Sequence, residues 1–354
     1  YIRRSITLAD PTCHTRFFMP AILPRLTEVE SPSIGLGCMN LSHGYGQPVP
    51  EPEALRALEE AFDMGYRHFD TATLYGATAN ERVVGKALAG KRNAILLASK
   101  CGMAIDPGLG RKVIDGRPDT LRRQCEASLS RLRTDHIDLY YLHRLDRNVP
   151  IEESVGALAR LVEEGKLGAI GLSEVSAATL RRARTEHPIA AVQSEYSLWT
   201  RNPEIALLEA CREANTALVA FSPLGRGFLA GAVTTHEQLA EGDVRRSMPR
   251  FSADNLASNL RQLEKLQTLA TELEVTTGQL ALAWLKAQGN DVIPIPGTRS
   301  IAHMRENLAA ETLRLDASTL ERLGSILTPA QVAGARYNEA LQAEIDTEEF
   351  ELDA

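Results

Sequence analysis

The chain has 354 residues, of which 44% are hydrophobic and 24% charged, and its formal net charge is −7. This balance is typical of a globular protein with a large buried core, and an acidic chain without a lysine- or arginine-rich block has no electrostatic footprint for nucleic acid. No apolar stretch approaches the ~20 residues that span a bilayer, and FFMPAIL near the start is too short and proline-broken for a signal sequence. We expect a cytoplasmic protein with neither nucleic-acid nor membrane partners.

The cysteines and histidines show no spacing that would build a disulfide framework or a metal site. The cysteines are odd in number, widely separated and never in a C-x-x-C pair, and the eight histidines are scattered. The sequence therefore predicts free thiols and no bound metal. The cysteines are Cys13, Cys38, Cys101, Cys125 and Cys211.

Short apolar runs alternate with longer amphipathic runs along most of the chain, which indicates alternating strands and helices. Each predicted strand is almost entirely apolar, as a parallel sheet covered by helices requires. Strands are predicted at 33–37, 68–70, 94–99, 137–143, 167–173, 189–195, 217–223 and 291–297. Helices are predicted at 53–62, near 80–89, at 119–132, 152–164 and 177–185, after Asn202 as N-cap with Pro203 in the first turn, over 256–288 with an interruption near 275–277, and at 301–309.

Eight consecutive strand–helix units favour a (β/α)₈ TIM barrel over an open, doubly wound sheet. The long insertions, at 101–117 and 222–254, both follow strands. In a barrel, the loops that follow the strands form the face that carries the active site. We expect an N-terminal extension over 1–32, the barrel over 33–325, and an acidic, partly disordered tail over 326–354.

Four residues with useful chemistry stand at or just after the C-terminal ends of predicted strands. Asp70, Lys100 and His143 end three different strands, and Tyr75 follows Asp70 closely. A barrel brings such strand ends together, and a buried lysine needs a carboxylate partner to stay charged. A cation beside a phenol is expected to lower the phenol pKa, so Tyr75 is a candidate proton donor to a carbonyl oxygen and His143 a second hydrogen-bond donor. Each residue alone also has an ordinary structural explanation, as a cap, a strand-end charge or a core histidine.

Eight stretches in order over residues 34–310 resemble the signature segments of the aldo-keto reductases. They are IGLGCMNLSHGYG, RHFDTATLYG, ASKCG, LYYLHR, EEGKLGAIGLSE, VQSEYSLW, FSPLGRGFLAG and IPGTRSIAHMRENLAA. The resemblance implies a (β/α)₈ barrel, NADPH-dependent reduction of small aldehydes or ketones, and a catalytic tetrad at Asp70, Tyr75, Lys100 and His143. Residues 1–32 depart from the family, whose members usually begin with a short hairpin under the barrel.

The same resemblance implies the cofactor contacts. Ser173 and Gln193 are expected to hold the nicotinamide carboxamide, Tyr196 to stack on the nicotinamide ring, and the Ser222–Gly227 loop to fold over the pyrophosphate. The remaining cofactor contacts are expected at Cys38, Met39, Pro223, Leu224, Gly225, Gly227, Gly297, Thr298, Arg299, His303, Glu306 and Asn307, and substrate contacts at Met39, Tyr75, His143 and Trp199.

The stretch IPGTRSIAHMREN indicates which cofactor is preferred. Ser300 is a predicted N-cap, so Arg299 lies beside a helix N-terminus, where the dipole disfavours a cation and favours an anion. The arginine makes sense there if it shares an anion with the helix end, and the resemblance identifies that anion as the 2′-phosphate of NADPH. His303 stands where many family members carry a second arginine, and a solvated surface Arg299 is the alternative.

Other interpretations fit the sequence less well. GRGFLA at 225–230 satisfies the dinucleotide fingerprint, but it follows the seventh strand and not the first, which argues against a Rossmann domain. A barrel hydrolase would need a second carboxylate where Lys100 and His143 stand. A cofactor-binding sensor or channel-associated subunit stays open as a non-enzymatic alternative, although no membrane segment or interaction module accompanies the barrel.

Substrate choice depends on loops whose sequence does not identify the physiological substrate. In a barrel these are the loops after the strands, here 41–50, 101–117, 197–202 and 225–254. Met39 and Trp199 are predicted apolar walls of the substrate site. We expect a monomer or a weak homo-oligomer.

Overall fold

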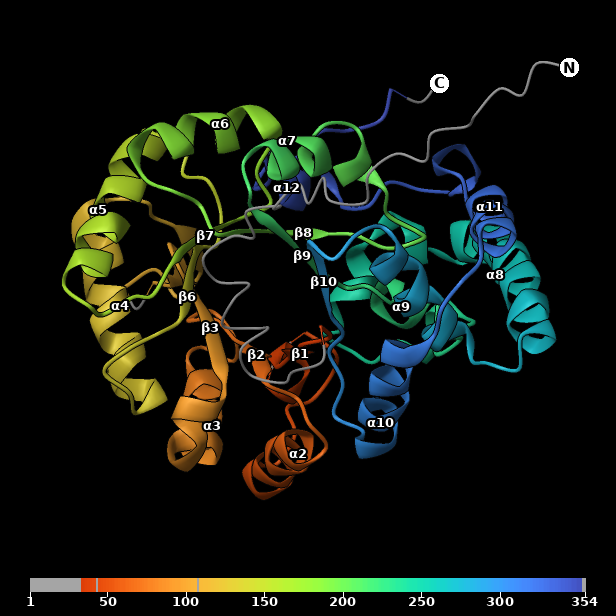
Figure 1. Ribbon diagram of the computed structural model, residues 1–354, viewed down its shortest axis with the longest axis horizontal. Coiled ribbons are helices and arrows are strands. Elements are labelled where there is room, and N and C mark those ends of the chain that lie inside the picture. Colours follow the sequence, from red (N-terminus) through yellow and green to blue (C-terminus); the bar gives the residue numbers. More distant parts are fainter. Residues whose placement is uncertain (1–32, 43, 107, 352–354) are drawn as a thin grey trace, which may run out of the picture.

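The computed structural model describes residues 33–42, 44–106 and 108–351, so the expected N-terminal extension over 1–32 lies outside the described residues. Its main sheet has eight parallel strands arranged around a central axis (Figure 1). They are β1 (Leu36–Gly37), β2 (His68–Asp70), β3 (Leu96–Cys101), β6 (Leu139–Leu142), β7 (Ile170–Ser173), β8 (Ala191–Glu195), β9 (Ala217–Phe221) and β10 (Val292–Ile295), paired in that order.

The first and last strands complete the ring. The Gly35 N–H donates to the Pro294 carbonyl at 3.0 Å, and the Gly37 N–H donates to the Pro296 carbonyl at 3.2 Å. A parallel bridge also joins Gly37 to Gly297. The predicted (β/α)₈ barrel is thus confirmed, with all eight expected strands in their expected order.

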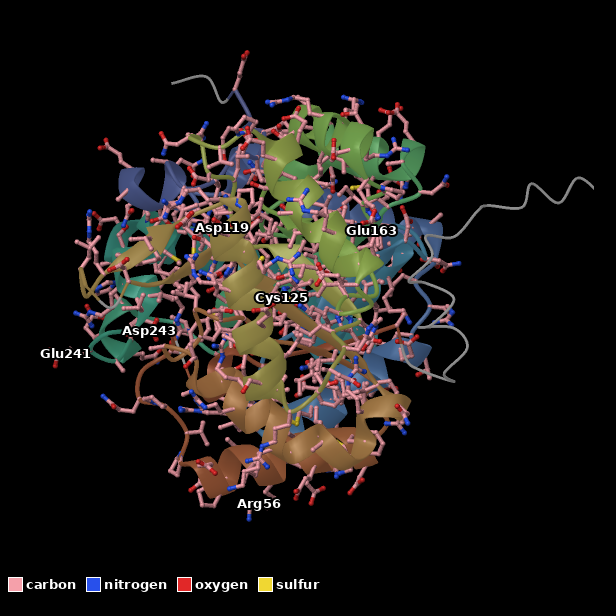
Figure 2. The ribbon with its side chains drawn as sticks, turned by 90° about the vertical axis from the view of Figure 1, so that its left-hand side faces the viewer. Arg56, Asp119, Cys125, Glu163, Glu241 and Asp243 are labelled. Carbon is pink, nitrogen blue, oxygen red and sulfur yellow. The ribbon has the colours of Figure 1, made fainter. Side chains whose placement is uncertain are left out.

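The helices surround the barrel, as Figure 1 shows. Figure 2 looks onto α4, which carries Cys125, and shows charged side chains such as Arg56, Asp119 and Glu163 on the outer helices, where all three are exposed. The outer helices are α2 (Glu51–Asp63), α3 (Ala79–Leu88), α4 (Pro118–Leu132), α5 (Ile151–Glu163), α6 (Ala177–Glu186), α7 (Leu207–Glu213), α8 (Ala253–Glu272), α9 (Thr277–Ala287), α10 (Ile301–Ala309) and α11 (Ala317–Ile326).

Alternate strand residues build two separate cores, because successive side chains on a strand point to opposite faces. One set faces the helices. The other fills the barrel interior and includes Leu96, Ala98, Tyr141, Val219 and Ile295. The interior is tightly filled: a Cβ atom on Gly171 would lie 2.3 Å from the ring of Tyr141, so only glycine leaves room for that ring. Because strand side chains alternate, a residue two positions after an interior residue again points to the interior, closer to the C-terminal end of the barrel.

The predicted helices begin and end largely where the sequence places them, with one exception, and α11 is a further helix that the sequence analysis does not predict. The predicted interruption of the long helical stretch is confirmed: Glu274 has a left-handed φ of 55°, and Thr276 opens α9 through a capping box with Gln279. The predicted N-cap at Asn202 is wrong. Residues Asn202–Glu204 form a separate 3₁₀ turn, η3, α7 begins only after Ala206, and the Asn202 amide donates to the Glu348 carbonyl at 2.9 Å.

Both long insertions are structured at the C-terminal end of the barrel. The first forms an antiparallel hairpin from β4 (Met103–Ile105) and β5 (Lys112–Ile114). The second consists of short 3₁₀ turns, which are η4 (Gly225–Gly227), η5 (His236–Gln238), η6 (Val244–Ser247) and η7 (Pro249–Phe251). Both loops contribute to the walls of the cavity described below.

The residues after α11, which the sequence analysis expects to be partly disordered, are folded as far as Glu351. They form η9 (Pro329–Gln331) and α12 (Glu339–Gln342) and pack on the barrel, with Tyr337 and Ile345 buried. Asp346 accepts a hydrogen bond from the Thr179 hydroxyl at 2.6 Å, at the start of α6. We call residues 329–351 the C-terminal segment. Specific polar contacts, which composition does not reveal, outweigh its acidic character.

The four described cysteines are buried free thiols. They are Cys38, Cys101, Cys125 and Cys211. Among the described residues, no helix is long and apolar enough to cross a membrane, and no three histidine, cysteine or acidic side chains gather as a metal site.

Candidate active site

A cavity of about 880 Å³ lies at the C-terminal ends of the strands, and three of the four candidate catalytic residues line it. Asp70 ends β2, Tyr75 lies in the loop after it, and His143 follows β6. Lys100, on β3, does not line the cavity but lies directly behind it, fully buried. The barrel thus brings together all four residues that the sequence analysis places at strand ends.

Lys100 forms the centre of this group. Its ammonium donates to the Asp70 carboxylate, to the Thr71 carbonyl at 2.9 Å and to the Tyr75 hydroxyl at 3.3 Å. The Lys100 and Asp70 side chains are only 1% and 3% exposed. Burial works against a charged lysine, but the Asp70 carboxylate and Tyr75 outweigh it and raise the Lys100 pKa above its ordinary value. The lysine is therefore a permanent cation at neutral pH.

The phenol of Tyr75 differs from the expectation. Burial raises the Tyr75 pKa above its ordinary value, and the charge of Lys100 opposes only part of that rise. The predicted lowering of the Tyr75 pKa is wrong, because burial destabilises the phenolate more than the neighbouring Lys100 cation stabilises it. The phenol is consequently protonated at neutral pH, with a cation beside its oxygen.

The loop after β2 holds Tyr75 in a strained turn. Gly76, Ala77 and Thr78 all have left-handed φ values, of 56°, 47° and 79°. Two of these residues carry a side chain, which makes the conformation costly unless the surroundings enforce it. Asn80 provides part of that support: its amide donates to the Cys38 carbonyl and to the Ser42 hydroxyl, both at 2.9 Å.

His143 lies next to Tyr75 on the cavity wall. The two rings meet edge to face, with centroids 5.8 Å apart and planes at 85°. Arg144 also lines the cavity, and its guanidinium donates to the His143 carbonyl at 2.6 Å and to the Ser173 hydroxyl at 3.3 Å. The sequence analysis overlooks Arg144, although its position next to a strand-end histidine could have suggested it.

Most predicted cofactor residues line the same cavity. One of them, Gln193, also contacts a candidate catalytic residue, since its amide nitrogen donates to the Asp70 carboxylate at 2.7 Å. The predicted cofactor residues on the wall are Met39, Ser173, Gln193, Ser222, Pro223, Leu224, Gly227, Gly297, Thr298, Arg299, His303, Glu306 and Asn307.

Besides Lys100, four residues predicted to contact the cofactor or the substrate do not reach the cavity wall. The Tyr196 side chain is buried against Trp284 and donates to Glu204 at 2.8 Å, and Trp199 stacks on Phe228 with ring centroids 4.1 Å apart. Cys38 belongs to the core under the helices, and Gly225 is buried beside Trp199. Within the described structure, none of these four is placed to contact a ligand in the cavity.

Phe221, and not Tyr196, reaches the cavity wall. It ends β9, two residues beyond the interior residue Val219, and lines the cavity. Tyr196 follows the interior-facing Gln193 by three residues, and an odd number of steps along a strand points the side chain to the opposite face. The two-residue alternation of the strands was the signal that could have identified Phe221.

One end of the cavity is rich in hydrogen-bond donors and positive charge. Arg299 is exposed on the wall just before α10, and the Ser300 hydroxyl caps that helix by accepting from the His303 N–H at 3.3 Å, as predicted. Arg226 and Arg245 also line the cavity, from the insertion after β9. They pair with Glu195 and Asp243, and Arg226 contacts Tyr337, so they do not add free charge to this end. Arg299 and the start of α10 suit phosphate groups, since cations and the N-terminal N–H groups of a helix both favour anions.

The other end of the cavity is more apolar. Met103 and Ile105 come from the β4–β5 hairpin, within the expected loop 101–117, whereas Tyr337, Leu341 and Ile345 come from the C-terminal segment, which the sequence analysis did not place at the site. The expected loops 41–50, 101–117 and 225–254 contribute to the wall, but 197–202 does not.

Comparison with known proteins identifies the family. Residues 33–328 match the model of the Aldo/keto reductase family. The chain belongs to the aldo/keto reductase family. This family consists of NADP-dependent oxidoreductases that act on carbonyl groups and the corresponding alcohols, so the protein is an enzyme of this class.

Two curated relatives illustrate how similar this aldo/keto reductase is to other members. Probable aldo-keto reductase 1 from Glycine max is 44% identical over 313 residues, covering 88% of this chain and 90% of its own. Aldo-keto reductase yakc [NADP(+)] from Schizosaccharomyces pombe is 43% identical over 311 residues, covering 86% and 91%.

Solved structures of other aldo/keto reductases share the fold. The glycerol dehydrogenase AKR11B4 from Gluconobacter oxydans superimposes with a TM-score of 0.77 at 28% identity, covering 84% of this chain and 92% of its own. An aldo/keto reductase from Klebsiella pneumoniae in complex with NADP and acetate gives a TM-score of 0.66 at 28% identity, covering 87% and 95%.

Proposed function

We propose that Tyr75 is the proton donor in the reduction of a small aldehyde or ketone. The observation that supports this role is the group of Asp70, Lys100, Tyr75 and His143 at one end of the cavity. Bound NADPH supplies the hydride for the carbonyl carbon. The Tyr75 hydroxyl then gives its proton to the carbonyl oxygen, and His143 contributes a second hydrogen bond to that oxygen.

Lys100 and Asp70 prepare Tyr75 for this step. Burial keeps the phenol protonated at neutral pH, so a proton is available. After transfer, the Lys100 ammonium, 3.3 Å from the hydroxyl oxygen, stabilises the phenolate that is left. Asp70 keeps the ammonium charged and in position. In the oxidative direction the same phenolate accepts the proton from an alcohol.

The donor-rich end of the cavity is assigned to the phosphates of NADPH, with Arg299 and the capped N-terminus of α10 at the 2′-phosphate. At the other end, the Gln193 nitrogen is already engaged by Asp70, so we assign the contact with the nicotinamide carboxamide to the Gln193 carbonyl and to Ser173. Phe221 replaces Tyr196 as the residue assigned to pack against the nicotinamide ring. Preference for NADPH over NADH follows from the Arg299 assignment.

Steady-state assays with a panel of aldehydes and ketones test this proposal. We expect NADPH to be consumed with one equivalent of alcohol formed, and the apolar wall from Met103, Ile105, Leu341 and Ile345 to favour substrates with an apolar substituent. A protein that binds NADPH but turns over no aldehyde or ketone would instead support the sensor alternative. The cytoplasmic location and the monomeric or weakly oligomeric state stay predictions.

A further inference from the structure

A second cavity, of about 380 Å³, lies between the barrel and the C-terminal segment. Its walls come from the turn after β8, from η7 and from the two ends of the C-terminal segment, and it shares no lining residue with the active-site cavity. It is therefore a separate compartment, and the catalytic proposal assigns it no role.

Two buried side chains on its wall carry donors that lack acceptors. Trp199 and Arg336 are only 3% and 4% exposed. The Trp199 Nε1 and the Arg336 Nε and Nη1 have no hydrogen-bond partner among the described residues. Buried donors without acceptors are costly, and a charged guanidinium is especially so. All three atoms are N–H donors, and no unpartnered buried acceptor lies on the wall that the structure describes.

The charged residues around this cavity also favour a negatively charged ligand. Three arginines line it, Arg201, Arg250 and Arg336, against a single described carboxylate, Glu349. Glu349 already accepts from the amides of Gln342 at 2.7 Å and Asn202 at 3.2 Å.

Arg250 is the arginine with the least compensation. Its Nη1 donates to the Trp199 carbonyl and the Thr200 hydroxyl, both at 2.8 Å, and its Nε donates to the Gly334 carbonyl at 3.3 Å, so its described side-chain hydrogen bonds all go to neutral acceptors. Burial lowers the pKa of Arg250 to about 10. Arg201 pairs with Glu204, and one Arg336 nitrogen pairs with Glu174, but the Nε and Nη1 of Arg336 have no hydrogen-bond partner among the described residues.

We propose that this cavity binds a small organic oxyanion, a carboxylate or a phosphate monoester. Its oxygens accept from the Arg336 and Trp199 donors and pair with Arg250. The apolar wall, formed by Leu198, Val332 and Phe350, holds its hydrocarbon part. The volume limits the ligand to a small molecule, and the apolar wall distinguishes it from an inorganic anion.

Isothermal titration calorimetry on the full chain saturated with NADP⁺ tests the proposal, because the cofactor then occupies the other phosphate-binding surface. The probes are benzoate, phenyl phosphate and inorganic phosphate. We expect one-to-one binding of benzoate, of phenyl phosphate or of both, at least about tenfold tighter than inorganic phosphate, a difference within reach of one buried apolar group.

Variants locate the binding. Arg250→Gln should weaken binding by roughly tenfold or more, the effect of losing one charge-assisted contact. Ala335→Glu, on the same wall, adds a carboxylate that competes with the ligand and should abolish binding while raising the melting temperature, whereas the matched Ala335→Gln should do neither. The Ala335 pair keeps the test decisive if Arg250→Gln folds poorly.

Benzoate that binds between Tyr75 and His143, in the active-site cavity, would also give a calorimetric signal. His143→Gln separates the two sites, since it should leave binding in the second cavity within about twofold, well inside the tenfold step of 1.4 kcal/mol. Binding lost in His143→Gln but kept in Arg250→Gln, no binding of either organic probe, or a melting temperature unchanged by Ala335→Glu would each overturn the proposal.

Discussion

The Lys100 ammonium and the Asp70 carboxylate form an ion pair inside the barrel, with both side chains at most 3% exposed. The two residues lie on neighbouring strands, β3 and β2, in a register that pairs Asp70 with Ala98, two residues before Lys100. The pair is therefore fixed by strand geometry and shielded from water, where ionic interactions are strong and unpaired charges costly.

Asp70→Ala should destabilise the protein and abolish most of its activity. It leaves the Lys100 charge buried without its carboxylate, which typically costs ~3–5 kcal/mol. Urea unfolding and aldehyde-dependent NADPH oxidation measure the two effects. The double variant Asp70→Ala/Lys100→Met removes both charges, so it should regain stability without regaining activity.

The exposed pair between Lys86 and Glu51 is the control, with side chains 48% and 55% exposed. Lys86→Gln should leave the melting temperature near that of the wild type, since solvent-exposed pairs contribute little. An Asp70→Ala variant as stable and as active as Lys86→Gln would contradict the role of the buried pair.

Tyr75→Phe should lower kcat by ~10²–10⁴-fold, the usual contribution of general acid catalysis. The variant keeps the ring that meets His143 and loses only the hydroxyl, so NADPH affinity, measured by fluorescence titration, should stay close to that of the wild type. Near-normal turnover in this variant would exclude Tyr75 as the proton donor.

Arg299→Ala should weaken NADPH binding by roughly ten- to a hundred-fold, because hydrogen bonds to charged groups contribute ~1.5–3 kcal/mol. NADH lacks the 2′-phosphate, so its Kd should barely change. Equal losses for both cofactors, or a wild-type enzyme that prefers NADH, would show that Arg299 does not recognise the phosphate.

His68 should make stability depend on pH. It lies in the barrel interior two residues before Asp70 and is 1% exposed, and burial lowers its pKa from 6.5 to about 4. The folded protein thus binds this proton more weakly than the unfolded chain. The contribution of His68 is complete above pH 6.5 and is lost as the pH falls from 6.5 towards 4, by about 3 kcal/mol in all.

Urea unfolding of the wild type and of His68→Gln at pH 7.5 and pH 4.5 measures this effect, since Gln cannot take up the proton. The difference in unfolding free energy between the two pH values should be smaller in His68→Gln by most of that amount. The exposed His303 is the matched control, and His303→Gln should keep the wild-type dependence. A dependence unchanged in His68→Gln would contradict the assignment.

The barrel and its strand-end chemistry could be predicted because they depend on local patterns. Continuous apolar runs give the parallel strands, and polar residues that end such runs, such as Asp70 and Lys100, must face the active end of a barrel. The family resemblance suggested Tyr196 as a cofactor contact, whereas two-residue steps from interior strand positions would have pointed to Phe221, which lines the cavity.

Other features depend on contacts between distant segments and leave no local signal. Asn202 is a residue type that often caps helices, but here its side-chain amide donates to the Glu348 carbonyl of the C-terminal segment. The acidic composition of that segment suggested disorder, yet its order depends on single contacts such as the pair between Arg336 and Glu174. The Tyr75 pKa likewise depends on the extent of burial, which no spacing of residues specifies.

Alkylation of the buried thiols can be used to follow unfolding of the protein. Burial raises the pKa of Cys125 to about 12 and raises the pKa values of Cys38, Cys101 and Cys211 as well, so the reactive thiolate is scarce at all four positions in the native state. An alkylating reagent at neutral pH should therefore modify these four residues only in molecules that have opened. The mass added to each peptide over time would then show which part of the barrel opens first.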